Sequence, residues 1–278
     1  MQEIGVFFKI FLGTVNACFC QKQKFVPMCL IAFNWMDHPA YRLILVGNRD
    51  EFFNRPTSSL HLWREGFYGG KDLKGGGTWM GFHPNGRFAT LTNHRVAKNP
   101  RLDPISRGYL VKDFLESNLE PLEYLHQIQG RMHRYEGFNL LVAKGEQMGY
   151  LSNFRSGPEI VPPGLYGISN AFLDTPWPKV VQAKAQLQEK LLEDKLDERG
   201  LLQLLQSRAY ASDEKLPATG VSKEMERILS AQFIHMGEEY GTVNTTALLW
   251  RHNGEVTISE KRIVPKQETT INFTIVTG

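Results

Sequence analysis

A single cysteine follows a methionine at the start of an apolar run, in the stretch Pro27-Met28-Cys29-Leu30-Ile31. If Met28 is the first residue translated and is then removed, Cys29 acquires a free α-amino group. Such an amine has a pKa of about 7.7–8.0, so part of it is unprotonated at neutral pH. It can act as the base for the thiol of the same residue, whose ordinary pKa is about 8.5. Cys29 is therefore a candidate nucleophile, and the alternative is a small buried residue at the start of a strand.

A predicted β-hairpin places Cys29 beside a polar tetrapeptide. Apolar runs at 30–35 and 42–46 are separated by turn residues, and the second run does not alternate with polar residues. These features predict two antiparallel strands that are covered on both faces. In the expected register the paired residue numbers sum to about 76 or 77. That register puts Cys29 beside Asn48 and the residues that follow it.

The tetrapeptide Asn48-Arg49-Asp50-Glu51 ends the second of these strands. Side chains alternate along a regular strand, so Arg49 and Asp50 can face Cys29 together only if the chain leaves the strand near Asn48. We therefore predict a bend there, which turns Glu51 toward helices or solvent. A nearby Arg49 would also favour the thiolate and lower the pKa of Cys29. The alternative is a solvated strand end that carries a surface ion pair.

A glycine-rich stretch at 69–79 lacks the Gly-Lys-Ser/Thr sequence of a phosphate-binding loop. Its glycines predict a close approach of the backbone to a ligand or to a neighbouring strand. The hairpin that follows brings Asn93 beside Gly76, where an amide and backbone N–H groups could bind an oxyanion. The alternative for Asn93 is a helix or turn cap. We assign to substrate binding Asn48, Asn93, Gly76, Gly77 and Trp79.

The remaining segments predict the layers that hold these residues. Helices are expected from Ser106 to about 117, from Pro121 to about 132, from Pro176 to about 194, over 197–208 and over 222–234. Strands are expected at 138–143, 147–151, 164–169, 245–251, 256–264 and 270–276. Hairpins dominate, and the helices fall into two clusters. The sequence therefore predicts an α+β fold, a four-layer αββα sandwich of two antiparallel sheets.

Composition excludes several classes of function. The chain has 278 residues, of which 42% are hydrophobic and 22% charged, and a net charge of +3. No basic stripe interleaved with aromatic residues indicates nucleic acid. Only Cys29 lies in the main body, so we expect a reducing compartment, the cytoplasm, rather than a disulfide framework. His126 and His133 lack partners at ligand spacing, so we predict structural histidines, no metal and no cofactor.

Residues 1–27 differ from the rest of the chain. Their apolar run at 6–12 is short and interrupted by Lys9, which makes a poor signal peptide and too short a segment to span a bilayer. We expect no stable membrane insertion. The order of preference is a misassigned gene start, then a cleaved propeptide, then a lipoprotein or secretory signal. The expected organisation is this extension followed by a single domain over residues 28–278.

Taken together, these motifs resemble the NRDE family, also known as the transport and Golgi organisation 2 family. The matching pieces span residues 28–278 in order, and they are Met28 to Ile31, Asn48 to Phe52, Gly76 to Trp79, Thr92-Asn93, Gly137 to Leu141, Ser169-Asn170 and Tyr240 to Thr242. The family in turn is similar to the N-terminal nucleophile hydrolases, which include the bile-salt and penicillin V acylases. The resemblance implies that Cys29 is the nucleophile, that Arg49 and Asp50 support it, and that Asn170 stabilises the oxyanion.

Two positions depart from these relatives. The family often has Arg after Tyr-Gly-Thr, where this chain has Val243, and the acylases' other oxyanion Asn corresponds by turn position to His83. Two functions therefore stay open. One is an amidohydrolase that cuts a linear C–N amide of a small acylated substrate. The other is a carrier of haem or lipid on the same scaffold, in line with the eukaryotic members' link to secretion and Golgi organisation.

Overall fold

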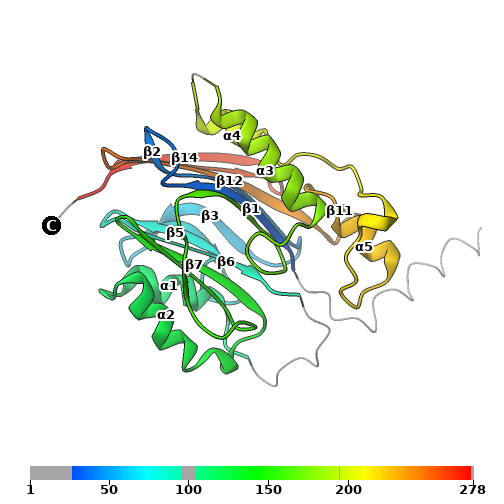
Figure 1. The fold of residues 1–278 in the computed structure, drawn as a ribbon, viewed down its shortest axis with the longest axis horizontal. Helices are drawn as coiled ribbons and strands as arrows, with labels where there is room; N and C mark the ends of the chain where they lie inside the picture. The colour runs from blue at the N-terminus through cyan, green and yellow to red at the C-terminus, as the bar shows by residue number, and fades with distance from the viewer. Residues whose placement is uncertain (1–26, 96–103, 194, 277–278) are drawn as a thin grey trace, which may run out of the picture.

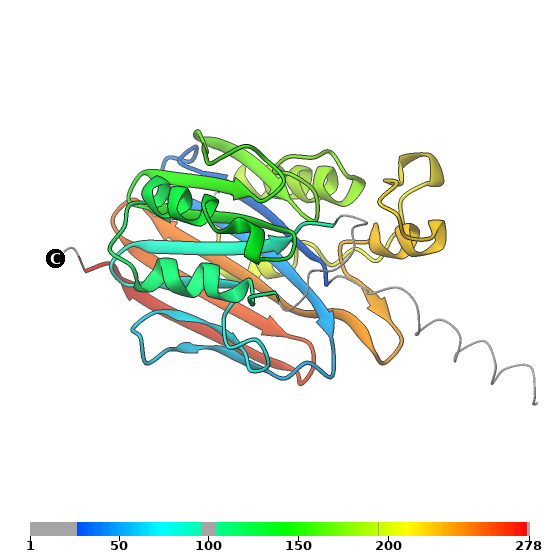
Figure 2. The same ribbon diagram turned by 90° about the horizontal axis from the view of Figure 1, so that it is seen from below.

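The structure, a computed structural model, describes residues 27–95, 104–193 and 195–276. Two antiparallel sheets stack face to face, and helices cover the outer face of each (Figures 1 and 2). The order helix, sheet, sheet, helix confirms the predicted α+β sandwich. The predictions for residues 1–26 and the expected helix end at 194 lie outside the described residues.

The first sheet carries the candidate nucleophile and the tetrapeptide on neighbouring central strands. Its order is β10-β1-β2-β12-β13-β14, with β11 paired to β12. The strands are β1 (Cys29–Trp35), β2 (Tyr41–Phe52), β10 (Gly164–Ile168), β11 (His235–Met236), β12 (Tyr240–Arg251), β13 (Glu255–Arg262) and β14 (Gln267–Thr274).

The second sheet is a meander in which each strand pairs with the next along the chain. Most of its connections are short, whereas β6 and β7 are joined by a segment that carries two helices. The strands are β3 (Thr57–Leu62), β4 (Tyr68–Asp72), β5 (Met80–His83), β6 (Arg87–Asn93), β7 (Phe138–Lys144), β8 (Gln147–Ser152) and β9 (Glu159–Ile160).

The helix at Pro121 begins where predicted, whereas the bounds of the other helices differ from the prediction. Trp177 precedes Pro178 and is therefore extended, so the longest helix begins at 178 and not at 176. The helix at 197–208 ends early, and Leu205 beyond it has a φ of 37°. The helices are α1 (Gly108–Glu116) and α2 (Pro121–Gln129) on the second sheet, α3 (Pro178–Leu191) and α4 (Glu198–Leu202) on the first, and α5 (Lys223–Leu229) near β11, with 3-10 turns at Met132–Arg134 and Asp213–Lys215.

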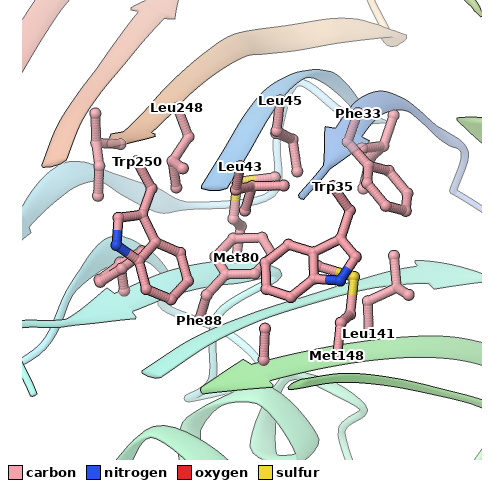
Figure 3. Packing of buried hydrophobic residues seen from close by; sticks show 14 of the residues in the cluster. Phe33, Trp35, Leu43, Leu45, Met80, Phe88, Leu141, Met148, Leu248 and Trp250 are labelled. Carbon is pink, nitrogen blue, oxygen red and sulfur yellow. The ribbon is translucent and has the colours of Figure 1, made fainter. Parts of the chain in front are cut away.

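The main hydrophobic core lies between the two sheets. Trp250 of β12 packs against Trp35 of β1 and edge-on against Phe82 of β5, with ring centroids 6.2 and 5.0 Å apart (Figure 3). Large aromatic side chains dominate the energetics of such a core. The contacts fix one sheet on the other, which holds the strand ends of both sheets in a constant relation.

The hairpin of β1 and β2 is offset by one residue from the predicted register. Cys29 lies directly opposite Arg49, and not Asn48. The predicted bend at Asn48 is also wrong, because β2 continues to Phe52. The reason is β12, which pairs with β2 along its whole length and keeps the tetrapeptide extended. The irregularity lies on β12 instead, where the register shifts at Val243.

Candidate functional site

A cleft of about 410 Å³ opens between the two sheets, at the edge where β1 begins and β2 ends. This volume is typical of pockets that bind small molecules. Cys29, Arg49 and Glu51 line it from the first sheet. The segment from Ser106 to Gly108, at the start of α1, lines it from the second. The cleft therefore brings the predicted nucleophile together with part of the tetrapeptide and with a helix start that is distant in sequence.

The Cys29 side chain lies on the inner face of the sheet, with Arg49 beside it. Directly opposite residues of an antiparallel pair share a face, and both residues line the cleft. Cys29 is only 5% exposed, and its carbonyl oxygen accepts a hydrogen bond of 2.7 Å from Ser169 Oγ. The pKa of the thiol is raised to about 12, mainly by burial and also by Asp50, and Arg49 opposes this rise. The predicted low pKa is thus wrong for this form of the chain.

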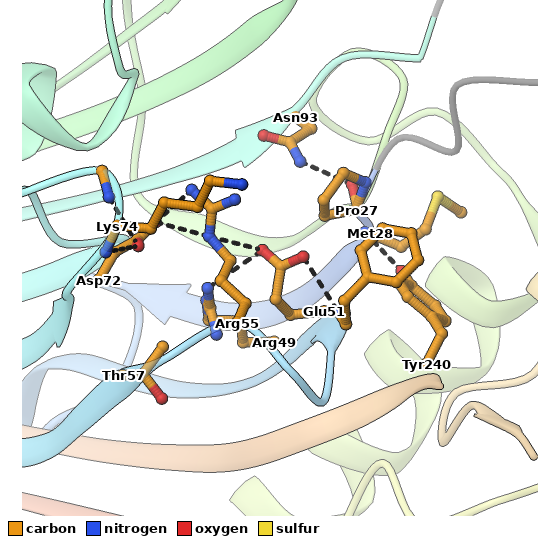
Figure 4. A network of polar contacts seen from close by, with 12 residues as sticks. Pro27, Met28, Arg49, Glu51, Arg55, Thr57, Asp72, Lys74, Asn93 and Tyr240 are labelled. Carbon is orange, nitrogen blue, oxygen red and sulfur yellow. Dashed lines mark hydrogen bonds and ion pairs between the residues drawn. The ribbon is translucent and has the colours of Figure 1, made fainter. Parts of the chain in front are cut away.

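In the structure Cys29 is preceded by Pro27 and Met28, and hydrogen bonds hold both of these residues in place (Figure 4). Met28 is completely buried; its N–H donates to Tyr240 Oη over 2.8 Å, and its carbonyl accepts from the backbone N–H of Asp50 over 2.8 Å. Asn93 Nδ2 donates to the carbonyl of Pro27 over 2.6 Å. The Cys29 nitrogen is therefore an amide here, so no free amine is present to serve as a base.

Glu51 joins two arginines at the mouth of the cleft, contrary to the expectation that it turns away (Figure 4). Its Oε2 lies 3.2 Å from Arg49 Nη2 and 3.5 Å from Arg55 Nε. Arg55 in turn binds Asp72 Oδ2 through Nε and Nη2, at 2.9 and 2.7 Å. Because Arg49 and Glu51 are two apart in an unbroken strand, they share the cleft face. These ion pairs form a continuous network of alternating charges that extends from β2 to the end of β4.

Replacing Glu51 by Gln should therefore destabilise the fold. The side chain of Glu51 is 6% exposed and also accepts from the N–H of Phe52. We expect a loss of about 1.5–3 kcal/mol in unfolding free energy, the range for hydrogen bonds to charged groups. Glu159→Gln, at an exposed pair with Arg155, should change it by less than about 0.5 kcal/mol. Urea denaturation of both variants measures this, and equal losses would contradict the network.

The side chains of Asn48 and Asp50 alternate with those of Arg49 and Glu51 and point to the helix-covered face of the sheet, although Asp50 also contributes to the lining of the cleft. Asn48 Nδ2 donates to the carbonyls of Leu205 and Gln232, so Asn48 is a buried structural residue outside the cleft lining. Its assignment to substrate binding is not supported by this position. Asp50 Oδ1 accepts a 2.6 Å hydrogen bond from Thr242 Oγ1. Burial raises the pKa of Asp50 to about 6.

The two candidate oxyanion amides lie next to one another. Asn170 is fully buried, and its Nδ2 donates to the carbonyl of Asn93 over 2.9 Å, while its Oδ1 accepts from Ser169 Oγ. Asn93 lines the cleft and Asn170 does not. In the form with Met28 attached, the Nδ2 of each side chain is thus bonded to a backbone carbonyl.

The glycine-rich stretch approaches another backbone segment. Gly77 packs on Gly108 of α1, and the N–H of Thr78 donates to the Gly108 carbonyl over 3.3 Å. Gly77 and Trp79 line the cleft, whereas Gly76, with a φ of 77°, is outside the lining. The predicted close approach of Gly77 is therefore made to the backbone at the start of a helix, and not to a neighbouring strand.

Several lining residues were not foreseen from the sequence. Arg107 lines the cleft beside α1, and its Nη1 donates to the Gly137 carbonyl over 2.8 Å. Arg107 directly follows Ser106, where the sequence predicts the start of a helix, and this position could have marked it as a candidate site residue. Glu260 and Arg262 of β13 also line the cleft, more than 200 residues after Cys29. No local sequence pattern predicts that Glu260 and Arg262 line the cleft, because β13 reaches the cleft only through the order of strands in the first sheet.

In the described part of the chain, no group of three His, Cys, Asp or Glu side chains could hold a metal ion. His126 and His133 are exposed. Nor does any helix within those ranges have the length and apolar character needed to cross a membrane.

Comparison with known proteins gives consistent matches. The family model described as Transport and Golgi organisation 2 matches residues 28–265. The Transport and Golgi organization 2 homolog of Mus musculus is 35% identical, over 89% of this chain and 99% of its own length. The Bos taurus homolog is 34% identical, over 87% and 95%. The Drosophila melanogaster protein is 32% identical, over 58% and 64%.

Among solved structures, a Caenorhabditis elegans N-acylethanolamine-hydrolyzing acid amidase ortholog is similar, with 14% identity and a TM-score of 0.45. The match covers 80% of this chain and 92% of that one. This likeness is too low to carry an argument about fold or activity.

Proposed function

This chain belongs to the Transport and Golgi organisation 2 family, and from that premise we propose that it is an amidohydrolase whose nucleophile is an N-terminal Cys29. The substrate is a small molecule with a linear C–N amide. The observation that carries this proposal is the position of Cys29 at the head of β1, with its side chain on a cleft of about 410 Å³ and Arg49 directly opposite. A reduced thiol is required, so the proposed location is the cytoplasm.

The reaction would proceed by acyl transfer in two steps. The α-amine of Cys29 takes the thiol proton, and Sγ attacks the substrate carbonyl carbon. The C–N bond then breaks, and the leaving nitrogen receives that proton, which leaves a thioester on Cys29. In the second step the amine deprotonates a water molecule, whose oxygen attacks the thioester carbon. The products are a carboxylic acid and the free thiol.

The residues around Cys29 fit separate parts of this reaction. The Arg49 guanidinium can stabilise the thiolate or a substrate anion. The amides of Asn93 and Asn170 lie at the adjoining strand ends, next to the Pro27 carbonyl. Release of the residues before Cys29 would free the Nδ2 group of Asn93 from that carbonyl. The proposal therefore assigns Asn93 to the oxyanion. Asn170 supports it by donating to the Asn93 carbonyl.

A panel of N-acyl amino acids and acyl amides tests the activity. The chain beginning at Cys29 should release amine from at least one member, and Cys29→Ala should reduce this to the background rate, since no other group can form the thioester. An acyl adduct on Cys29, seen by mass spectrometry at early times, would support the two steps. Equal rates for the wild type and Cys29→Ala would exclude the mechanism. Saturable binding of haem or lipid with no turnover of any amide would favour the carrier function instead.

A further inference from the structure

Lys179 occupies a position that is unfavourable for a lysine on three counts. It is the second residue of α3, where the helix dipole disfavours a cation. It is only 2% exposed, and removing an ammonium group from water carries a large cost. Its Nζ makes no hydrogen bond within the described ranges. Since proteins tolerate such destabilising positions mainly at functional sites, the position of Lys179 indicates a functional role.

The ionisable groups that influence Lys179 come from four parts of the chain, one of which is the start of β1. Lys179 interacts electrostatically with Asp50 of β2, Cys29 of β1, Arg95 beyond β6 and Glu226 of α5. Arg95 is held by Glu226 through an ion pair of 2.8 Å, so that carboxylate is already engaged. Asp50 is different, because its Oδ2 is buried and has no hydrogen-bond partner. Among the described residues Lys179 makes no ion pair, so Asp50 acts on it at longer range, as a buried carboxylate with one unpartnered oxygen.

Asp50 itself faces other groups on and beside its strand. Arg49 favours its ionised form, Glu51 disfavours it, and the hydroxyl of Thr242 stabilises it by a hydrogen bond. The phenol of Tyr240 also lies within electrostatic reach. Among these influences on the carboxylate, Lys179 is the largest that opposes the effect of burial. Without it, the buried carboxyl group would favour the protonated form.

We propose that Lys179 is a positioning residue for Cys29, which acts by holding Asp50 ionised next to the nucleophile. The inference rests on the proposed function. An ionised Asp50 can accept a charge-assisted hydrogen bond from the α-amino group of a mature Cys29 and so orient the base. A protonated Asp50 could not bind the protonated amine in this way.

The pH range of the pair follows from the two shifts. Burial raises the pKa of Asp50 to about 6 and lowers the pKa of Lys179 to about 8. Asp50 therefore gains its charge as the pH rises through about 6, and Lys179 loses its charge as the pH rises through about 8. Between these values both groups are charged, which is also where the α-amine begins to lose its proton.

NMR titration of the Asp50 carboxyl carbon tests the inference without any substrate. The signal is assigned in the full chain through its loss in Asp50→Asn. In Lys179→Met the titration midpoint should rise by at least about one pH unit, as expected when an opposite charge is removed. Lys179→Arg should keep the midpoint near that of the wild type. Lys184→Met, on the same helix but in an exposed pair with Asp174, should leave it unchanged.

The outcomes separate this inference from the proposed function. An unchanged midpoint in Lys179→Met would overturn the inference, even in a chain that hydrolyses amides. If Lys179→Met does not fold, Lys179→Gln replaces it, with the same expected shift. In an active chain, the acid limb of the pH–rate profile should move upward with the Asp50 midpoint. A shifted midpoint with an unmoved acid limb would overturn the positioning role. A shifted midpoint in a chain that cleaves no amide would overturn only the proposed function.

Discussion

Removal of the residues before Cys29 should raise the alkylation rate of its thiol at pH 7.5 by about a hundredfold. With Met28 attached, the pKa of the Cys29 thiol is raised to about 12. At pH 7.5 only about one thiol in 10⁴ to 10⁵ is therefore ionised. A thiol at the ordinary pKa of about 8.5 would be ionised in about one molecule in ten. Part of the gain is lost, since a thiolate of lower pKa is a weaker nucleophile.

The causes of the raised pKa show why the change should be so large. Burial is the main cause, and Met28, itself fully buried, is joined to Cys29 by a peptide bond at the start of β1. A chain that begins at Cys29 would expose this end to water and place an ammonium group beside the thiol. Both changes favour the thiolate.

Peptide mass spectrometry with iodoacetamide can follow Cys29 alone in two forms of the protein. One is the full chain, and the other is a chain released at Cys29 from a cleavable fusion. The urea-unfolded full chain supplies the rate of an unperturbed thiol. Equal rates for the two folded forms would show that the preceding residues do not control the thiol.

Replacing Gly77 by Ala should cost about 3 kcal/mol of unfolding free energy, at the upper end of the range for overpacking. A Cβ at position 77 would lie 2.6 Å from the Gly108 carbonyl oxygen and closer still to its carbonyl carbon. Both neighbours are backbone atoms at the start of α1, so no side-chain rotation can relieve the clash. The wall of the cleft formed by the glycine-rich stretch would have to separate from α1.

Gly130→Ala is the matched control. Gly130 follows α2 with a φ of −62°, and a Cβ there would meet its nearest heavy atom at 3.7 Å. The substitution should change unfolding free energy by less than about 1 kcal/mol, and it can be stabilising because the unfolded chain loses freedom. Thermal and urea unfolding of the two variants give the comparison. A loss for Gly77→Ala no greater than for Gly130→Ala would show that the contact with α1 is unimportant.

The layers of the fold could be predicted from the sequence because hairpins are local. Apolar runs separated by turn residues placed Cys29 near the tetrapeptide. The register was wrong by one residue, since Cys29 pairs with Arg49. The predicted bend was wrong because β12, a strand from the far end of the chain, keeps β2 extended. Since faces alternate along a strand, this extension put Glu51 in the cleft and turned the Asp50 side chain to the helix-covered face.

The electrostatics of the site could not be predicted in the same way. The pKa of the Cys29 thiol depends first on burial and then on Asp50, and neither effect is visible in the spacing of residues. The sequence around Lys179 predicts a solvated, charged helix, yet Lys179 is buried, on a helix that packs on β1 and β10. Similarly, Val243 departs from the arginine expected in the family, but the structure supplies the cleft with Arg107 and Arg262 from other elements.

The intact mass and N-terminal sequence of the protein, purified after expression from its own gene, test the central claim most directly. The claim is that Cys29 works with a free α-amino group, for which every residue up to Met28 must be absent. We predict a mass that corresponds to residues 29–278 and a first sequencing cycle that yields cysteine. A purified, folded protein that retains Met28 in peptide linkage to Cys29 would contradict it.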